Sequence, residues 1–489
     1  MHTTTVFRKI APFVALLGLG LTACQPDLEA DFKPSAGSAD FARYVAVGNS
    51  LTAGFSDNGL YLEGQQNSYP ALLAQQFKLA GGGDFTQPLF ASSEKNGSGY
   101  LRLEGFTNPP APATPSPIIR PVTTELATSR GKGLDGRTEL LTRYTGTDNQ
   151  NLGVPGIRVA DVLTPGYGLN NPIGFNNFFE RLLPAGSPTS YLQYVQERVS
   201  TVKPTFFTNW LGNNDVLGYA SSGGTAAPLT PVADFTTRYN QVVDALTVNG
   251  AKGVLVTIPN VTSAPYFTTV LTAAVIARIN ATPIPAALVP VIVAQLGLPA
   301  GSPLPAGTRF GLYIRTSATG AAAVREATAS DLLLLPASSF INTTSATSPF
   351  PNGVGLVIPG APAPIPAALA ASANPLPNNL VLDASEIGLA TARTTELNNA
   401  IRAAAARKSL AVFDANTFFA QVTTSGIVTN NVSNTTSFIS GNLFSLDGVH
   451  LTPRGYAIVT NELIKATNLQ YGARVPALNP ADYRGVKFP

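Results

Sequence analysis

The sequence is poor in the side chains that most often carry metal, redox or disulfide chemistry. Its 489 residues include one cysteine, Cys24, and two histidines, His2 and His450. A single cysteine can neither close an intrachain disulfide nor build a zinc–thiolate site. Because so few nitrogen and sulfur ligands are present, only carboxylates remain for a metal site. We therefore expect no metal and no cofactor.

Charge is also scarce. Charged residues make up 12% of the chain, the formal net charge is +3, and lysine and arginine are scattered without a run or stripe. Since phosphate tracking needs clustered cations, we expect no nucleic-acid partner. The hydrophobic content of 44% is ample for a buried core, which indicates a globular protein and excludes a disordered one.

The N-terminus predicts an export signal with a lipid anchor. Arg8 and Lys9 precede the apolar run 10–21, and the segment 21–24, Leu-Thr-Ala-Cys, resembles a lipobox. In proteins with that box the cysteine is diacylated, with chains such as palmitate, and becomes the first mature residue. It tethers the chain to a membrane without spanning it. The alternative is an ordinary signal peptide with an incidental Cys24.

The sequence around Cys24 also indicates a location in the cell envelope. Gln25 follows the cysteine, so the aspartate that in some bacteria retains lipoproteins at the inner membrane is missing. This favours the outer membrane over the inner membrane. The stretch 268–298 is apolar enough to suggest a membrane span, but Arg278 and three prolines interrupt it.

Apolar runs alternate with amphipathic stretches along the rest of the chain. Unbroken apolar runs are typical of strands that are covered on both faces. The expected strands are 43–47, 205–211, 253–258 and 410–413, and the expected helices are 68–79, 232–248 and 394–407. This alternation predicts an α/β, doubly wound parallel sheet, with functional loops at the carboxyl ends of the strands.

Two segments interrupt the alternation and are interpreted as insertions. One covers about 85–150 and is rich in Gly, Pro and Thr, and the other covers about 262–380 and is dominated by Ala, Pro, Leu and Val. The expected organisation is a signal peptide at 1–23, a tether at 24–40, one folded domain at 41–470 that includes both insertions, and a C-terminal tail at 471–489.

His450 is the only histidine that remains once the predicted signal is removed, so any serine–histidine mechanism must use it. It lies in the segment 445–453, SLDGVHLTP, where Asp447 precedes it by three residues. Asp447 can reach Nδ1 of the ring, fix its tautomer and stabilise the imidazolium that forms when Nε2 takes a proton. The alternative is a surface histidine beside an unrelated aspartate.

Ser50 follows the first expected strand, in the segment 48–54, GNSLTAG. A serine at the carboxyl end of a strand can present its hydroxyl at the mouth of the sheet, and the flanking glycines permit a sharp turn. A serine that only caps a helix after a strand is the alternative.

Two further strand ends supply candidate oxyanion donors. The segment 151–156, NLGVPG, ends in Gly156, and the segment 210–215, WLGNND, contains Asn214. The N–H groups of Ser50 and Gly156 and the side-chain amide of Asn214 would give three donors for a developing negative charge. Gly and Asn also mark plain turns.

Taken together, these four segments resemble the four conserved blocks of the SGNH/GDSL hydrolases, a family of esterases, lipases and acyl transferases with a flavodoxin-like fold. The resemblance covers residues 41–84, 151–261 and 381–468. It implies a flavodoxin-like SGNH sandwich with two large insertions. It also implies Ser50 as nucleophile, Asp447 and His450 as the other triad members, and Ser50, Gly156 and Asn214 as the oxyanion hole.

The chain departs from the family pattern in two respects. Asn49 stands where the Gly-Asp-Ser-Leu signature has aspartate, and the chain is much longer than the family core. An asparagine can still hydrogen-bond the turn, but the loss of its charge changes the electrostatics of the loop. Nothing in the family pattern predicts the role of the insertions.

The function implied by the resemblance is serine-dependent hydrolysis of a carboxylic ester through an acyl-enzyme. The identity of the ester substrate stays open. If the segment 270–298 is a lid, lipid or long-chain esters are favoured, and if the cleft is narrow, short esters or acetylated glycans are favoured. That segment can instead be a packing layer. A further alternative is a surface lipoprotein that binds a glycan or lipid on the same scaffold with little or no catalysis.

Rival hydrolase classes find little support in the sequence. No Gly-x-Ser-x-Gly pentapeptide occurs, which argues against an α/β-hydrolase. The segments 92–95 (SSEK) and 56–58 (SDN) match motifs of penicillin-recognising enzymes, but in the wrong order and without Lys-Thr-Gly. Trp210, the only tryptophan, is interpreted as a core residue beside the candidate oxyanion segment.

Overall fold

A five-stranded parallel sheet forms the centre of the protein. The computed structural model describes residues 32–108, 115–169, 175–316, 323–361 and 365–489. The sheet has the order β12-β6-β5-β1-β4. Its strands are β1 (Tyr44–Gly48), β4 (Asn151–Gly153), β5 (Phe206–Trp210), β6 (Lys252–Val256) and β12 (Ala411–Phe413). The chain thus winds outward in both directions from β1, which is the order of a flavodoxin-like fold.

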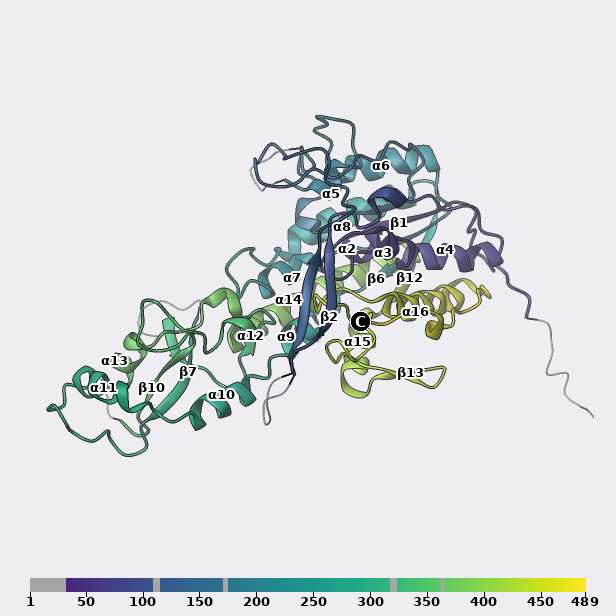
Figure 1. The fold of residues 1–489 in the computed structure, drawn as a ribbon. Coiled ribbons are helices and arrows are strands. Elements are labelled where there is room, and N and C mark those ends of the chain that lie inside the picture. Colours follow the sequence, from purple (N-terminus) through teal and green to yellow (C-terminus); the bar gives the residue numbers. More distant parts are fainter. Residues whose placement is uncertain (1–31, 109–114, 170–174, 317–322, 362–364) are drawn as a thin grey trace, which may run out of the picture.

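Helices cover both faces of this sheet, so the core is an α/β/α sandwich (Figure 1). Side chains alternate along β1: Val45 and Val47 join one hydrophobic cluster, Tyr44 and Ala46 the other. The first cluster is covered by α6 (Tyr191–Val202), α8 (Val232–Thr247) and α14 (Ala384–Lys408). The second is covered by α4 (Tyr69–Leu79), α15 (Ala415–Ser425) and α16 (Pro453–Tyr471).

The expected strands and helices are found, with shifts at their ends. The start of α14 lies ten residues before the predicted one, at Ala384, because Asp383 and Glu386 form a capping box there. The buried positions in the first half of this helix are Glu386, Ala390 and Thr394, which form no apolar stripe that would predict it. The bounds of β4 were not predicted, although 151–156 was expected to lie at a strand end, since three residues are too few for a periodic pattern.

The segment 85–150, which was expected to be the first insertion, contributes an antiparallel hairpin that lies against the main core (Figure 1). It consists of β2 (Tyr100–Phe106) and β3 (Pro117–Val122), with a bulge between Leu103 and Gly105. Leu103 is buried together with Leu446 of the loop before His450. The hairpin therefore helps to fix that loop.

Most of the segment 262–380, which was expected to be the second insertion, forms a lobe that projects away from the sandwich (Figure 1). Its three-stranded sheet has the order β10-β7-β8 and is packed with its own hydrophobic cluster. The elements of the lobe are α10 (Thr272–Ala281), α11 (Val289–Gln295), β7 (Arg309–Arg315), β8 (Val324–Glu326), β10 (Val354–Val357) and α13 (Ile365–Ser372).

Shorter elements connect these parts. They are α2 (Ser50–Ala53), α3 (Leu62–Gln66), α5 (Asn177–Glu180), α7 (Asn214–Ala220), α9 (Pro265–Thr268), β9 (Leu332–Leu333), α12 (Ala337–Phe340), β11 (Val381–Leu382), β13 (Ile427–Thr429) and β14 (Val432–Asn434). The strands β9 and β11 pair with each other where the lobe joins the sandwich.

The predicted signal peptide, Cys24 and the first part of the predicted tether lie outside the described residues. From Ser35 onward the chain is already held, because Ser35 pairs with Arg474 and the Ser38 N–H donates to Tyr471 O at 2.8 Å. Among the described residues, no single helix has the length and apolar character to cross a membrane. The helix α10 and the residues 286–295 reach that length and apolar character only when they are taken together, and the two are bent by 81° relative to each other.

Candidate active site

Ser50 lies where β1 ends and the one-turn helix α2 begins. Asn49 caps this helix, since its Oδ1 accepts from the Leu51 N–H at 3.0 Å. Only glycine fits at position 48, because a Cβ there would lie 2.0 Å from Thr52 Oγ1. As the first residue of the helix, Ser50 keeps its N–H free of intrahelical bonding and points its side chain into the space above the sheet edge.

The loop before α16 brings His450 to Ser50. The ring Nε2 lies 2.8 Å from Ser50 Oγ, and Nδ1 lies 2.9 Å from Asp447 Oδ2. Because Asp447 accepts from Nδ1–H, the ring presents an unprotonated Nε2 to the serine hydroxyl. Ser50 is 7% exposed and the His450 side chain 15% exposed, so the pair is shielded yet reachable.

Asp447 is held as an anion by four hydrogen-bond donors. Besides the His450 ring, it accepts from the N–H groups of Asn58, Val449 and His450, at 2.7–2.8 Å. Burial by itself would raise the pKa of this carboxyl. The charge of His450 and the hydrogen bonds outweigh burial and hold the pKa of Asp447 well below its usual range. The carboxylate can therefore stabilise an imidazolium at any working pH.

A tight turn that sequence reasoning dismissed supports this arrangement. Ser56 and Gly59 exchange two backbone hydrogen bonds, and Asp57 and Asn58 between them both have positive φ, 52° and 61°. Asp and Asn tolerate this conformation, which is that of a type I′ turn. The turn presents the Asn58 N–H to Asp447, and Asp57 Oδ1 accepts from the Leu446 N–H at 3.0 Å. The Asp-Asn-Gly sequence signals a turn, but nothing in it signals this contact.

The two other predicted oxyanion donors lie at the same edge. Gly156 and Asn214 both line a groove that also contains Ser50 and His450. Gly156 has φ +82° and its N–H meets no acceptor among the described residues. Asn214 Nδ2 donates one hydrogen to Ile157 O at 3.0 Å, which leaves the second amide hydrogen available.

Asn176 orients the Gly156 donor, a role that the sequence did not reveal. Its Nδ2 donates to Pro155 O at 2.8 Å, and its Oδ1 caps α5 by accepting from the Phe179 N–H at 2.9 Å. The Pro155 carbonyl and the Gly156 N–H belong to one planar trans peptide, so they point in opposite directions. By holding the carbonyl, Asn176 fixes where the Gly156 N–H points.

Asp215 ties the same loop to α7. Its buried carboxyl accepts from the N–H groups of Val159 and Ala160 and from Thr230 Oγ1, at 2.7–3.1 Å. Burial raises the pKa of Asp215 to about 6, although these donors oppose the rise. The loop that carries Gly156 is thus fixed from both sides, by Asn176 and by Asp215.

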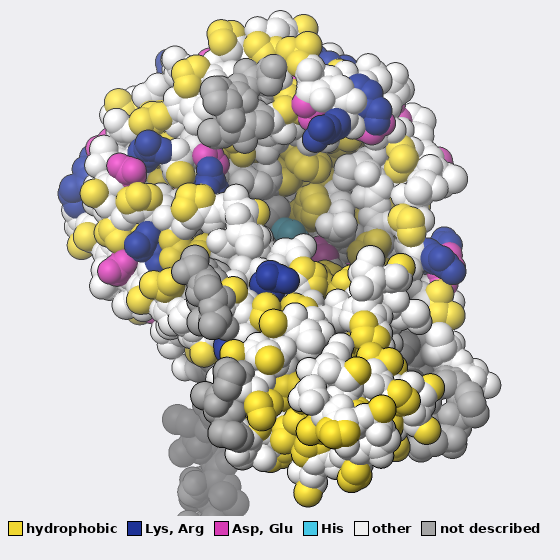
Figure 2. Space-filling model, turned by 90° about the vertical axis from the view of Figure 1, so that its left-hand side faces the viewer, with side chains coloured by type: hydrophobic (Ala, Val, Ile, Leu, Met, Phe, Trp, Pro, Cys, Tyr) yellow, Lys and Arg dark blue, Asp and Glu magenta, His cyan; other side chains and the backbone are white. Residues whose placement is uncertain are grey.

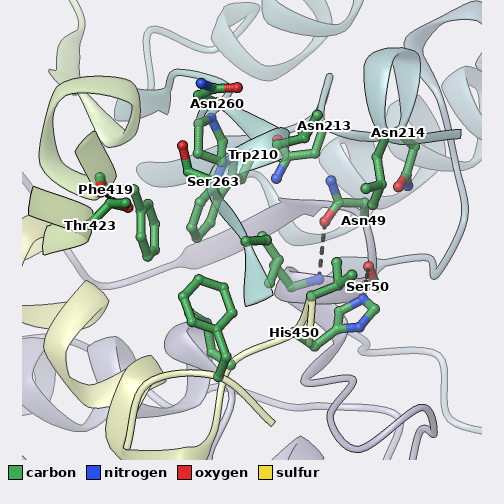
Figure 3. Close-up of a pocket in the computed structure, with 18 residues that line it drawn as sticks. Asn49, Ser50, Trp210, Asn213, Asn214, Asn260, Ser263, Phe419, Thr423 and His450 are labelled. Carbon is green, nitrogen blue, oxygen red and sulfur yellow. Dashed lines mark hydrogen bonds between the residues drawn. The ribbon is translucent and has the colours of Figure 1, made fainter. Parts of the chain in front are cut away.

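Two grooves meet at Ser50. The inner groove, with a cavity volume of about 60 Å³, is the more enclosed and is mostly apolar. Its walls include Leu51, Trp210, Val261, Ser263, Ala264, Phe419, Phe444, Val449 and Leu451. Figure 3 shows Ser50 and His450 at one end of it and Phe419 and Thr423 at the other.

The outer groove, with a cavity volume of about 360 Å³, is more open and runs over the loop that carries Gly156. Its walls include Phe55, Pro155, Gly156, Phe175, Asn176, Asn177 and Phe178. Ser50, Asn214, Leu217 and His450 line both grooves. In Figure 2 the histidine side chain lies in a hollow with hydrophobic side chains above it.

Several other sequence-based interpretations can be placed. Trp210 is fully buried against Tyr69 and Phe413, and it also forms part of the inner wall. The described residues of 270–298 line neither groove. Val275, Ile279 and Ile292 pack into the core of the lobe, and many of the other residues in the stretch are exposed. Lys95 of the SSEK segment forms an exposed ion pair with Glu125. In the part of the chain that the structure describes, no three His, Cys, Asp or Glu side chains are grouped to hold a metal ion.

Comparisons with known proteins add no family to this geometry. No model of a known protein family matches the chain, and a search of curated proteins returned no match.

Proposed function

We propose that the protein is a serine-dependent carboxylic ester hydrolase of the SGNH/GDSL type, with its two large insertions outside the family core. The observation that carries the proposal is the chain of contacts from Ser50 Oγ through the His450 ring to Asp447, at 2.8 and 2.9 Å. Three side chains that lie up to 400 residues apart in sequence meet with the geometry of a nucleophile, its base and the group that orients the base.

The reaction runs through an acyl-enzyme. His450 Nε2 takes the proton of Ser50 while Oγ attacks the ester carbonyl, and the resulting oxyanion is bound by the N–H groups of Ser50 and Gly156 and by Asn214. His450 then gives its proton to the leaving alcohol. Water attacks the acyl-serine with His450 again as base, which releases the acid and regenerates Ser50.

The location is part of the same proposal. Lipidation of Cys24, together with removal of residues 1–23, would anchor the enzyme in the cell envelope, at the outer membrane, and such an anchor needs no membrane-spanning helix. Support comes from the sequence alone, through the resemblance of 21–24 to a lipobox. Acyl analysis of the N-terminal peptide tests it, and an unmodified Cys24 in the mature protein would refute the anchor.

Ser50→Ala tests the proposed function. The wild type should hydrolyse simple esters and be labelled at Ser50 by a fluorophosphonate. The variant should lose turnover by roughly 10⁴-fold or more, with its melting temperature preserved. Peptide mapping of the labelled protein provides the control for position. Hydrolysis that persists in the variant would rule out Ser50 as nucleophile.

A further inference from the structure

The two grooves at Ser50 differ in a way that bears on the substrate. Neither is lined by a lysine, arginine, aspartate or glutamate side chain. An anionic group such as a phosphate would enter either groove without a counter-charge and would lose its hydration there. The lining therefore disfavours an ester with an anionic group on either side of the scissile bond.

The inner groove suits a flexible apolar chain. Phe419, Phe444 and Leu451 are buried in the core and expose only the edges that form its wall, while Ser263 and Thr423 contribute small side chains. Such an enclosed apolar groove gains from excluding water and offers little to a group with many hydroxyls.

The outer groove has a different surface, made of aromatic rings and amides. Phe55, Phe175 and Phe178 are all half-buried, and Phe55 and Phe178 meet edge to face with ring centroids 5.8 Å apart. Phe55 also lies against the His450 ring, at 4.7 Å between centroids. These rings therefore lie beside the base that must protonate the leaving alcohol.

A polar group accompanies these rings. Asn177 donates through Nδ2 to Glu139 O at 3.1 Å, while its Oδ1 receives no donor from the described residues. Flat aromatic faces pack well against ring C–H groups, which carry partial positive charge, and a free amide oxygen accepts a hydroxyl. The combination matches an alcohol that has an apolar ring face and a hydroxylated edge.

We propose that the two grooves divide a neutral ester between them. The inner groove binds the acyl chain, and the outer groove binds a ring-bearing, hydroxylated alcohol such as a sugar against Phe55, Phe175 and Phe178. This assignment rests on the proposed function. In the acylation step the Ser50 Oγ–carbonyl bond forms and the bond from carbonyl carbon to sugar oxygen breaks. That oxygen takes the proton from His450 and leaves through the outer groove.

The test crosses two substrate series with two sets of variants. Butanoyl esters of methanol, methyl glucoside, choline and glycerol phosphate vary the alcohol and its charge, and methyl esters from acetyl to decanoyl vary the chain. Phe178→Ala and Phe178→Leu alter the outer groove, the second keeping an apolar side chain without a ring. Ser263→Phe fills the inner groove. Melting temperatures exclude misfolded variants.

The wild type should prefer the glucoside ester over the methyl and choline esters in kcat/KM, because only the glucoside offers hydroxyls to the free amide oxygen, and it should disfavour the anionic glycerol phosphate ester. Both Phe178 variants should lower the glucoside preference by about three- to tenfold and leave the chain-length profile unchanged. Ser263→Phe should shorten the preferred chain and leave the alcohol preference unchanged.

Three results would each overturn the division. The first is that the Phe178 variants change the chain-length profile while Ser263→Phe changes the alcohol preference. The second is equal turnover of anionic and neutral esters, and the third is a wild type without a preference for the glucoside ester. In all these cases Ser50-dependent hydrolysis would still uphold the proposed function. No hydrolysis of any ester, together with no fluorophosphonate labelling of Ser50, would remove both.

Discussion

The carboxyl edge of the central sheet and the projecting lobe differ in how much of their order comes from polar contacts. At the sheet edge, Asp447 accepts four hydrogen bonds and Asp215 three, and Asn176 uses both ends of its amide. In the lobe, one buried carboxylate, Asp331, accepts from Arg325 and Thr328, while the stretch 332–382 contains no charged residue at all. Figure 2 shows many hydrophobic side chains on the surface of the lobe.

The difference shows where each region obtains its order. Apolar packing fills the core of the lobe, whereas the sheet edge depends on directional bonds that fix individual atoms. Substitutions at the sheet edge should therefore affect chemistry first, and substitutions inside the apolar core of the lobe should affect local stability first. Three variants test this contrast, beginning with the largest effect.

Asp447→Asn should be the most damaging of the three. The amide nitrogen of the variant would face donors that now meet a carboxylate, so the His450 ring would lose its orientation. We expect kcat to fall by roughly 10³- to 10⁴-fold. Steady-state kinetics on a simple ester measures this, with circular dichroism as the control for folding. Near-normal kcat would show that Asp447 does not orient the base.

The same variant makes a prediction about pH. Because the pKa of Asp447 is lower in the folded than in the unfolded protein, its contribution to stability is fully present above the unfolded value of about 3.9 and is lost as the pH falls toward the folded value. The free energy of unfolding of the wild type should therefore drop below about pH 4. In Asp447→Asn part of that drop should be missing. If the free energy of unfolding of the wild type and of the variant had the same dependence on pH, this would contradict the lowered pKa of Asp447 in the folded protein.

Asn176→Asp should have an intermediate effect. The variant keeps the oxygen that caps α5 but replaces the donor to Pro155 O with an acceptor, so the peptide that carries the Gly156 N–H is released. We expect kcat to fall by about 10- to 100-fold with KM little changed, because the donor acts on the oxyanion and not on the bound ester. Asn461→Asp is the matched control, because it also removes a side-chain donor to a backbone carbonyl, that of Leu478, and lies outside both grooves. A rise in KM alone would indicate that Asn176 contacts substrate instead.

Leu312→Ala should have the smallest effect on activity. This buried β7 side chain belongs to the core of the lobe, and its loss should destabilise the lobe by about 2–5 kcal/mol. Activity should stay within about twofold of the wild type, since no described lobe residue between 270 and 298 lines a groove.

Trp210, the only tryptophan, reports on the sandwich alone. In urea, its fluorescence transition should stay in place for Leu312→Ala while circular dichroism shows an earlier step. Leu255→Ala, in the sandwich core, is the matched control and should shift the fluorescence transition. If Leu312→Ala shifts it equally, the lobe and the sandwich unfold as one unit.

Much of the fold could be predicted because its elements have local signals. The strands at 205–211 and 253–258 are continuous apolar runs, and the helix at 232–248 has a clear stripe. The element bounds that could not be predicted have physical reasons. β4 is too short to show a periodic pattern, and the first half of α14 is polar and capped and is buried by its contacts with α7. Of the site, Ser50, Asp447, His450, Gly156 and Asn214 were predicted and lie together.

Asn58 and Asn176 were missed because each acts through a contact across the fold. Asn58 reaches Asp447 over 389 positions, and Asn176 reaches Pro155 from a different loop. An asparagine in a turn or at a helix start has an adequate local explanation in its own backbone. The residues next to such an asparagine in the sequence do not show whether it also positions a reacting group elsewhere in the fold.

The sequence by itself determined the alternation of strands and helices, the single histidine available to a serine, and the strand ends at which the reactive groups lie, because these follow from local periodicity and composition. Only the tertiary structure decided which donors saturate Asp447, which amide orients Gly156 and how the space around Ser50 splits into two grooves. Those features depend on side chains that approach one another from distant segments, to within tenths of an ångström, and local preferences do not encode such approaches.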